Sequence, residues 1–302
     1  MHKPSGAQLS LDIKEEKLSP AQPCYDLHAH STYSDGELTP DQLFALAAQC
    51  GVDALALTDH DTVAGLSDAA VAAKRYGVEL VPGAEISARL SLTPKLTLVV
   101  HLVGLYLKRL EALDAHLRLI GEARAERARQ MCIKLKDRLG VDVYDSALKK
   151  AGSDASALTR SHMARALVEC GAVGSIQKAF DLHLANAKPA YVELQAPVLN
   201  EVIAWIHEAG GVSVLAHPTR YGLSATNTRR LIDAFALAGG QAVELCRDSE
   251  SPGTRGMINM KIREHDLLVS TASDFHGPSM PWNRLGQVPA LRAGQRGVWT
   301  LF

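Results

Sequence analysis

Residues 25–36 read YDLHAHSTYSDG, and the short β-rich run YDLHAH that opens this stretch carries two histidines at alternate positions, His28 and His30. Alternate side chains of a β-strand point the same way, so both imidazoles could reach one metal ion. An ordinary hydrogen-bonded pair is an equally good interpretation of this motif taken alone. The following Ser34-Asp35-Gly36 is a typical turn sequence. The stretch therefore predicts a β-strand whose carboxyl end carries polar side chains.

The same arrangement recurs along the chain, where short β-rich runs alternate with amphipathic helical stretches. The first helix is expected to begin at the capping box Thr39-Pro40-Asp41-Gln42 and to end at Gly51. Further helices are expected near residues 64–76, 198–209, 227–237 and 254–265. Such alternation predicts an α/β fold with a parallel sheet, either open or closed into a barrel.

Residues 108–188 differ in composition from the rest, being rich in Ala, Leu, Arg and Glu, with several helical patterns and no clear strand. We interpret this segment as an all-helical insertion between two strands. The α/β unit is then discontinuous and consists of residues 24–107 and 189–302. Residues 1–23 are polar and lack the apolar region of a signal peptide, so we expect a polar tail there.

Charge and cysteine content limit the class of partner. The chain has 32 Lys and Arg against 33 Asp and Glu, which argues against a general polyanion binder but allows a small phosphorylated substrate. The five cysteines lie far apart without a Cys-x-x-Cys pair, which is typical of reduced thiols in the cytoplasm. The most apolar run, residues 96–107, is too short to span a bilayer. We expect a cytoplasmic protein that binds no membrane and needs no protein partner.

Polar side chains with metal-binding groups fall at or near the ends of successive predicted strands. These six histidines and three carboxylates are His28, His30, Asp35, His60, Glu85, His101, His217, Asp274 and His276. In parallel α/β folds the carboxyl ends of the strands share one face, where active sites lie. Asp35 alone is well explained by a turn, and His101 alone by a buried core histidine. A multinuclear metal site explains all of these residues together, and its nitrogen and oxygen donors favour manganese, zinc or iron.

Taken in order, these motifs resemble the PHP (polymerase and histidinol phosphatase) family. They are DLHAHSTYSDG at 26–36, TDHDT at 58–62, PGAE at 82–85, the isolated His101 and His217, and SDFH at 273–276. The resemblance runs from about residue 24 to about residue 289 and is greatest to 3',5'-nucleoside bisphosphate phosphatases and related 5'-to-3' exoribonucleases. One departure is the stretch ARLSLTPKLTLVV at 88–100, which is longer than is usual in the family.

The resemblance implies a distorted (β/α)7 barrel with two or three divalent ions, of which manganese is the first expectation and zinc or iron the alternatives. One ion would be held by His28, His30, Glu85 and Asp274, a second by Asp35, His60 and His276, and a third by Glu85, His101 and His217. A metal-bridging hydroxide would attack phosphorus. Asp61 and His217 are candidates to assist proton transfer.

The function implied is hydrolysis of the 3'-phosphate of nucleoside 3',5'-bisphosphates, with 5'-to-3' trimming of short 5'-phosphorylated RNA as a second activity. Histidinol-phosphate phosphatase is an alternative, because it shares the metal motifs. An alternative of another class is a catalytically silent PHP module with a structural role, although such a module often lacks some ligands.

The helical insertion contains the candidates for substrate recognition. Arg124, Arg127 and Arg129 lie in one basic run, which alone is best interpreted as a solvated helix face paired with Glu122 and Glu126. Thr159 is a predicted helix N-cap, so Arg160 and His162 lie in a first turn whose free amides favour anions. By analogy with the resembling nucleotidases, the favoured substrate-binding residues are Arg127, Arg160 and His162. Arg220, which follows His217-Pro218-Thr219, is a further candidate.

Overall fold

Seven strands pair in chain order to form one sheet, and the computed structural model describes residues 23–246, 251–280 and 283–302. The strands are β1 (Tyr25–Ala29), β2 (Ala54–Leu57), β3 (Glu79–Thr93), β4 (Leu96–Leu105), β5 (Val212–Leu215), β6 (Ala242–Cys246) and β7 (Leu268–Ala272). Beyond β7, Phe275 bridges Ala29, and the backbone N–H of Asp274 donates to the carbonyl of His28 at 3.0 Å. The sheet therefore curls into a nearly closed barrel, as the sequence predicted. The expected tail lies outside the described residues except for Pro23.

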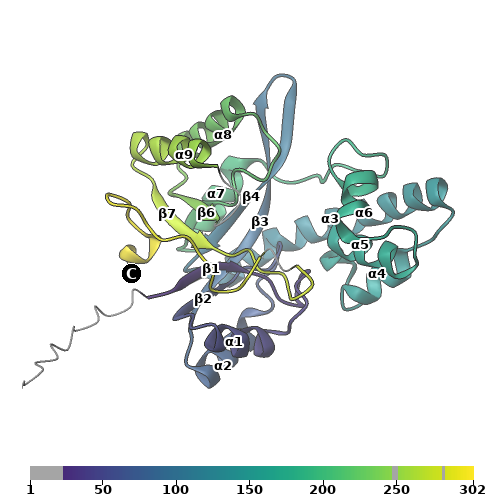
Figure 1. The fold of residues 1–302 in the computed structure, drawn as a ribbon, viewed down its shortest axis with the longest axis horizontal. Helices are drawn as coiled ribbons and strands as arrows, with labels where there is room; N and C mark the ends of the chain where they lie inside the picture. The colour runs from purple at the N-terminus through teal and green to yellow at the C-terminus, as the bar shows by residue number, and fades with distance from the viewer. Residues whose placement is uncertain (1–22, 247–250, 281–282) are drawn as a thin grey trace, which may run out of the picture.

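Strand β4 runs against the other six strands. It pairs antiparallel with both β3 and β5, whereas the remaining neighbours pair parallel. Only Pro94 and Lys95 separate β3 from β4, so no crossover helix can return the chain to the start of a parallel strand. The prediction of a parallel sheet is thus wrong for β4. The two strands form a long ribbon that projects from the barrel at the top of Figure 1.

Helices cover the outside of the barrel: α1 (Pro40–Gln49), α2 (Leu66–Tyr76), α7 (Leu199–Glu208), α8 (Ala225–Leu237) and α9 (Pro252–Glu264). Helix α1 begins as predicted, because the Thr39 hydroxyl accepts from the Gln42 N–H while the Gln42 side chain accepts from the Thr39 N–H. Figure 1 shows α1 and α2 beside β1 and β2, and α8 and α9 beside β6 and β7. Phe44 of α1 and Phe235 of α8 are fully buried in the two apolar layers under these helices.

A second group of helices lies to one side of the barrel (Figure 1). It comprises α3 (Leu110–Leu139), α4 (Tyr144–Lys150), η1 (Ala155–Ala157), α5 (Arg160–Glu169), α6 (Ile176–Ala179) and the π-helical turn η2 (Phe180–Leu184). This group has an apolar core of its own, which includes Met131 of α3 and Leu167 of α5. Long helix α3 joins it to the barrel. Across residues 23–246, 251–280 and 283–302, no helix is both long and apolar enough to cross a membrane.

Candidate metal centre

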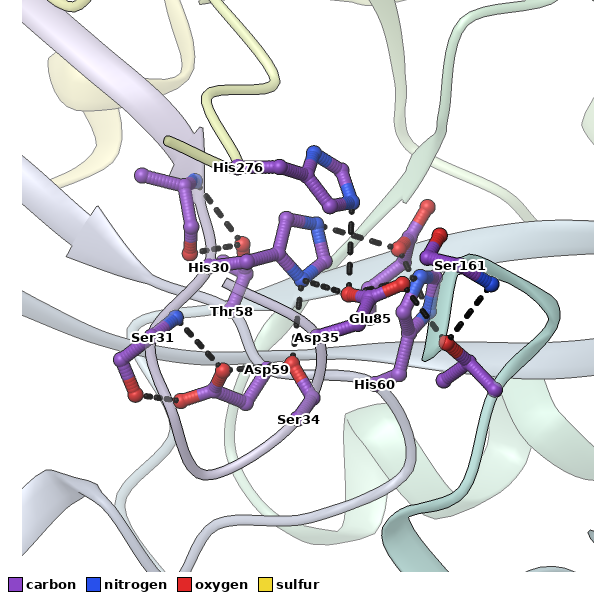
Figure 2. A network of polar contacts seen from close by, with 12 residues as sticks. His30, Ser31, Ser34, Asp35, Thr58, Asp59, His60, Glu85, Ser161 and His276 are labelled. Carbon is purple, nitrogen blue, oxygen red and sulfur yellow. Dashed lines mark hydrogen bonds and ion pairs between the residues drawn. The ribbon is translucent and has the colours of Figure 1, made fainter. Parts of the chain in front are cut away.

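The nine candidate ligands converge at one end of the barrel. His28 lies in β1 with His30 one residue past its end, while Glu85 and His101 lie within β3 and β4. His101 pairs with Ser87, two residues along β3 from Glu85, so the histidine and the glutamate share one face of the ribbon. Figure 2 shows the rings of His30, His60 and His276 turned toward Asp35 and Glu85. The antiparallel course of β4 therefore still delivers His101 to the common site.

Three residues at this end of the barrel adopt a left-handed backbone conformation that is uncommon outside glycine. They are Asp61 (φ 52°), His217 (φ 29°) and Asp274 (φ 53°). Asp61 follows β2, His217 follows β5 and Asp274 follows β7, each within four residues of the strand end. Such conformations cost about 1–3 kcal/mol each and persist only where surrounding contacts hold them. They occur most often at functional sites.

Glu85 lies at the centre of the cluster. Its Oε1 is 2.9 Å from both His101 Nδ1 and His217 Nε2. Its Oε2 lies 2.8 Å from His60 Nδ1 and 3.4 Å from the Nε2 atoms of His28 and His30. Burial raises the pKa of Glu85, but the histidines around it outweigh burial and hold the pKa well below its ordinary value. An ionised carboxylate in this position can bridge neighbouring cations.

In both Asp35 and Asp274, one carboxylate oxygen contacts a residue outside the nine candidate ligands, and the other lies near the histidines of the cluster. Asp35 Oδ2 accepts from the Thr159 hydroxyl at 3.1 Å, whereas Oδ1 lies 3.4–3.8 Å from nitrogens of His30, His60 and His276. Asp274 Oδ2 pairs with Arg220. Its Oδ1 lies 3.4 Å from His30 Nε2 and 3.5 Å from nitrogens of His28 and His276.

Several buried polar atoms of the cluster have no hydrogen-bond partner among the described residues. They are Asp35 Oδ1, His60 Nδ1, Glu85 Oε2, His101 Nδ1, His217 Nδ1 and Asp274 Oδ1. His60 Nδ1 lies 2.8 Å from Glu85 Oε2 and His101 Nδ1 lies 2.9 Å from Glu85 Oε1, but neither pair has the directions that a hydrogen bond requires. A buried polar atom left unsatisfied costs about 1–3 kcal/mol, so such a cluster indicates that another group completes it.

Divalent cations fit this cluster. Three groups of side chains offer ligand atoms within 4.8 Å of one another: His30, Asp35, His60 and His276; His28, His30 and Glu85; and His60, Glu85 and His101. Their donors are imidazole nitrogens and carboxylate oxygens, a set that suits manganese, zinc and iron. These groups overlap with the three ligand sets implied by the family resemblance, and one includes His101, but none includes Asp274 or His217.

Two buried carboxylates that sequence reasoning missed support the candidate ligands from behind. Glu244 Oε2 lies 2.6 Å from His28 Nδ1, and Glu244 Oε1 accepts from the His217 N–H at 3.1 Å. Asp59 accepts from Ser31 and from the Ser34 hydroxyl, which fixes the turn before Asp35. A partner on His28 Nδ1 leaves the Nε2 lone pair facing the centre. Glu244 had a signal in the sequence, because a carboxylate inside the apolar strand AVELC needs a partner.

A cavity of about 590 Å³ opens above the cluster, between the barrel and the second group of helices. Its wall on the helical side includes Arg124, Arg127, Arg160 and Tyr191. The guanidinium groups of Arg127 and Arg160 lie 5.5 and 5.8 Å from the centre of the Tyr191 ring. Burial, together with the neighbouring charges of Arg160 and Arg124, lowers the pKa of Arg127 to about 9. This crowding of positive charge favours an anion in the cavity.

The other recognition candidates lie in different surroundings. Arg220 lines the cavity, but its guanidinium pairs with Asp274. His162 is fully buried behind the cavity wall, where its Nδ1 accepts from the Thr159 N–H at 3.1 Å. Burial lowers the pKa of His162 to about 4, so its ring is neutral at pH 7.

The basic run of α3 divides between the two sides of the helix. Arg129 is exposed and lies 3.5 Å from Glu126, as expected for a solvated face. Arg124 is buried instead and pairs with Asp61, which also accepts from the N–H and hydroxyl of Ser87 at 2.7 and 2.9 Å. Of the two residues expected to assist proton transfer, His217 therefore contacts the cluster directly, whereas Asp61 is occupied with Arg124 and Ser87.

The fold, the site and the comparisons with known proteins agree on the class of enzyme. Residues 26–208 match the PHP domain. A solved structure from Bifidobacterium adolescentis, described as a candidate metal-dependent phosphoesterase, superposes with a TM-score of 0.79 at 28% identity and covers 94% of this chain and 96% of its own. This protein is a metal-dependent phosphoesterase. It belongs to the PHP family.

Two curated relatives cover nearly the whole chain. The 5'-3' exoribonuclease Rnm of Escherichia coli is 39% identical over 282 residues, which is 92% of this chain and 93% of the relative. The 3',5'-nucleoside bisphosphate phosphatase of Chromobacterium violaceum is 38% identical over 275 residues, or 91% of this chain and 94% of the relative. The names of both relatives refer to phosphorylated nucleotide or RNA substrates.

Proposed function

We propose that this enzyme hydrolyses the 3'-phosphate of nucleoside 3',5'-bisphosphates, with 5'-to-3' trimming of short 5'-phosphorylated RNA as a second activity. The observation that carries the proposal is the cavity, which joins two regions suited to anions. Its floor is the candidate metal centre, and its wall holds Arg127 and Arg160, neither of which has a carboxylate partner among the described residues. Two such regions suit a substrate with two phosphates, and the names of the relatives support the same choice.

We assign metal binding to the nine residues predicted from the sequence, and expect two or three divalent ions, manganese before zinc or iron. When bound, the ions would activate water and neutralise the phosphoryl oxygens. The support for this assignment is the set of buried nitrogen and oxygen atoms that lack partners.

The side chains of the cavity wall would hold the rest of the substrate. Arg127 is fixed by donation from its Nε to the carbonyl of Val192 at 2.7 Å, and Arg160 donates to the carbonyl of Leu184 at 3.4 Å. Held in this way, both guanidinium groups can bind the phosphate that is not cleaved. Asp61 would hold Arg124 at the same wall.

We further propose that residues 108–188 are an insertion for substrate recognition, and that 24–107 and 189–302 form the catalytic barrel. The support is that α3, α5 and η2 supply Arg124, Arg127, Arg160 and Phe180 of the cavity wall, whereas the barrel supplies the candidate ligands and Arg220. A cytoplasmic location is proposed from the free thiols of Cys24, Cys50, Cys132 and Cys170.

The recognition proposal is tested with a pair of substrates that differ in one phosphate. Arg160→Met should lower kcat/KM for adenosine 3',5'-bisphosphate by about 10- to 100-fold, because a hydrogen bond to a charged group contributes about 1.5–3 kcal/mol. The same variant should leave kcat/KM for adenosine 3'-monophosphate nearly unchanged. Arg129→Met is the matched control and should behave as wild type with both substrates, since Arg129 faces solvent.

Histidinol phosphate and a 5'-phosphorylated oligoribonucleotide complete the substrate panel for the manganese-loaded protein. Faster turnover of histidinol phosphate than of the bisphosphate would reject the proposed substrate. An equal loss with both adenosine nucleotides in Arg160→Met would instead reject the role of Arg160 in binding the second phosphate.

A further inference from the structure

The first turn of α5 contacts the candidate metal centre through its N-cap residue. The Thr159 hydroxyl accepts from the Ser161 N–H at 3.2 Å and lies 3.1 Å from Asp35 Oδ2. A hydroxyl has one hydrogen to donate and two lone pairs that accept. The hydroxyl also lies 3.4 Å from His162 Nδ1, but that nitrogen already accepts from the Thr159 N–H, so the hydroxyl donates its hydrogen to the nearer Asp35 Oδ2. Both side chains are buried, with residue exposures of 6% for Thr159 and 2% for Asp35.

The same helix also holds the backbone of Asp35. Arg165, five residues along α5 from its first residue, donates from Nη2 to the Asp35 carbonyl at 2.9 Å. It also lies 3.4 Å from Glu37, two residues after Asp35. The side chain and the main chain of this one aspartate are therefore both attached to α5.

These contacts determine which carboxylate oxygen faces the histidines. The last torsion of an aspartate side chain is broad and roughly two-fold, so an unsupported carboxylate could present either oxygen or rotate between them. Thr159 binds Oδ2, and Oδ1 is then left among the nitrogens of His30, His60 and His276 without a hydrogen-bond partner. We propose that Thr159, supported by Arg165, is a positioning residue that orients Asp35 for metal binding, so that the helical segment controls how tightly one ion is held.

This inference rests on the proposed role of Asp35 as a metal ligand, and it sets Asp35 apart from the other two carboxylates. Glu85 is surrounded by barrel histidines, and Asp274 is held by Arg220, which also belongs to the barrel part of the chain. Thr159 lies 124 residues from Asp35 in sequence and belongs to the helical segment. Only for Asp35 does the described structure show a supporting side chain from those helices.

The alternative to this inference is that Thr159 only caps α5. Thr39, at the start of α1, provides a matched control for that alternative. Thr39 caps α1 with the same kind of capping box, but its hydroxyl contacts Gln42 and, within the described residues, no candidate ligand. Thr39→Val and Thr159→Val therefore remove equivalent caps, and only the second removes a contact to Asp35. Thr159→Ser keeps both the cap and the contact.

The test measures manganese stoichiometry and affinity of the full-length protein by chelator competition and calorimetry. Thr159→Val should lower the affinity for one manganese ion by about 10- to 100-fold, the usual effect of removing a group that supports a ligand. Thr159→Ser should restore the affinity, and Thr39→Val should leave it unchanged. Wild-type affinity in Thr159→Val, an equal loss in Thr39→Val, or no recovery in Thr159→Ser would each overturn the inference.

Two further variants keep the outcome interpretable. Arg165→Met leaves the cap intact and should lower the affinity for the same ion. This variant tests the inference if Thr159→Val does not fold, and unchanged affinity in Arg165→Met would then overturn it. Asp35→Ala should lose that ion altogether. If Asp35→Ala binds manganese as wild type does, the ligand assignment of the proposed function fails. If Asp35→Ala loses the ion while Thr159→Val keeps it, the inference alone fails.

Discussion

Glu85 has more contacts to candidate ligands than any other carboxylate of the described cluster, with five histidines within 3.4 Å of its two oxygens. Glu85→Gln preserves the size of the side chain but removes its negative charge. We expect the variant to lose at least one bound ion and essentially all phosphatase activity, because a neutral amide is a poor bridge between cations. Elemental analysis of the purified protein measures the ion content directly.

The control for this substitution lies on the same strand. Glu79 begins β3 but is exposed, so Glu79→Gln should retain the metal content and activity of the wild type. Wild-type metal content in Glu85→Gln would contradict the central place given to this carboxylate.

At the scale of single residues, the sequence predicted features that depend on neighbouring residues, but it did not predict contacts between residues far apart in the chain. The N-cap role of Thr159 was readable because capping involves only the next few residues. Arg124 also had a local signal, since it continues the stripe of Leu117, Ile120 and Met131 that is buried along α3. Its partner Asp61 is 63 residues away, and no sequence pattern pairs the two. The same limit applies to the contact between Thr159 and Asp35.

At the scale of elements, the alternation of strands and helices predicted the α/β fold, and the family resemblance implied the barrel, but neither predicted the direction of β4. The deciding feature is the short connection between β3 and β4, where a proline and a lysine leave no room for a crossover. Strand ends predicted the positions of His60 and His217, which follow parallel strands. The place of His101 in the cluster could be assigned only from the register of the antiparallel pair, in which His101 lies opposite Ser87.

The close packing of the ribbon gives a second prediction. A Cβ on Gly83 of β3 would lie 2.8 Å from the Gly104 carbonyl oxygen and 2.8 Å from Thr58 Cγ2. Gly83→Ala should therefore destabilise the protein by about 1–3 kcal/mol, the usual cost of overpacking. Urea unfolding measures this change, and metal affinity should fall with it, because Glu85 lies two residues further along β3.

The opposite sign is expected for a glycine with open space around it. Gly256 lies in the interior of α9, and among the residues that the structure describes a Cβ there would meet no heavy atom within 4 Å. Gly256→Ala should stabilise the protein by about 0.5–1 kcal/mol, since alanine favours a helix more than glycine does. Equal effects in the two variants would show that β3 can move to accept the added methyl group.

At the scale of the whole molecule, the barrel and the helical segment have separate apolar cores and share the walls of one cavity. The six buried atoms of the cluster that lack partners belong to residues that line this cavity. We therefore expect metal ions to stabilise the protein as a whole. At a free manganese concentration of one hundred times Kd, binding should add about 2.7 kcal/mol to the free energy of unfolding.

Calorimetry of the protein treated with EDTA, and again after manganese is added, measures this effect. The Tm should rise with manganese concentration, and magnesium should raise it less, because imidazole-rich sites suit magnesium poorly. A Tm that is independent of added manganese would contradict the assignment of the centre.

The adjacency of Thr159 and Arg160 at the start of α5 has a thermodynamic consequence. One of these residues contacts Asp35, and the other faces the cavity. Any anion that orders this turn and thereby strengthens ion binding must itself be bound more tightly, by the same factor, when the ion is present. The affinity for the nucleotide would then depend on the concentration of the metal ion. A fall in that concentration would release the substrate as well as the ion.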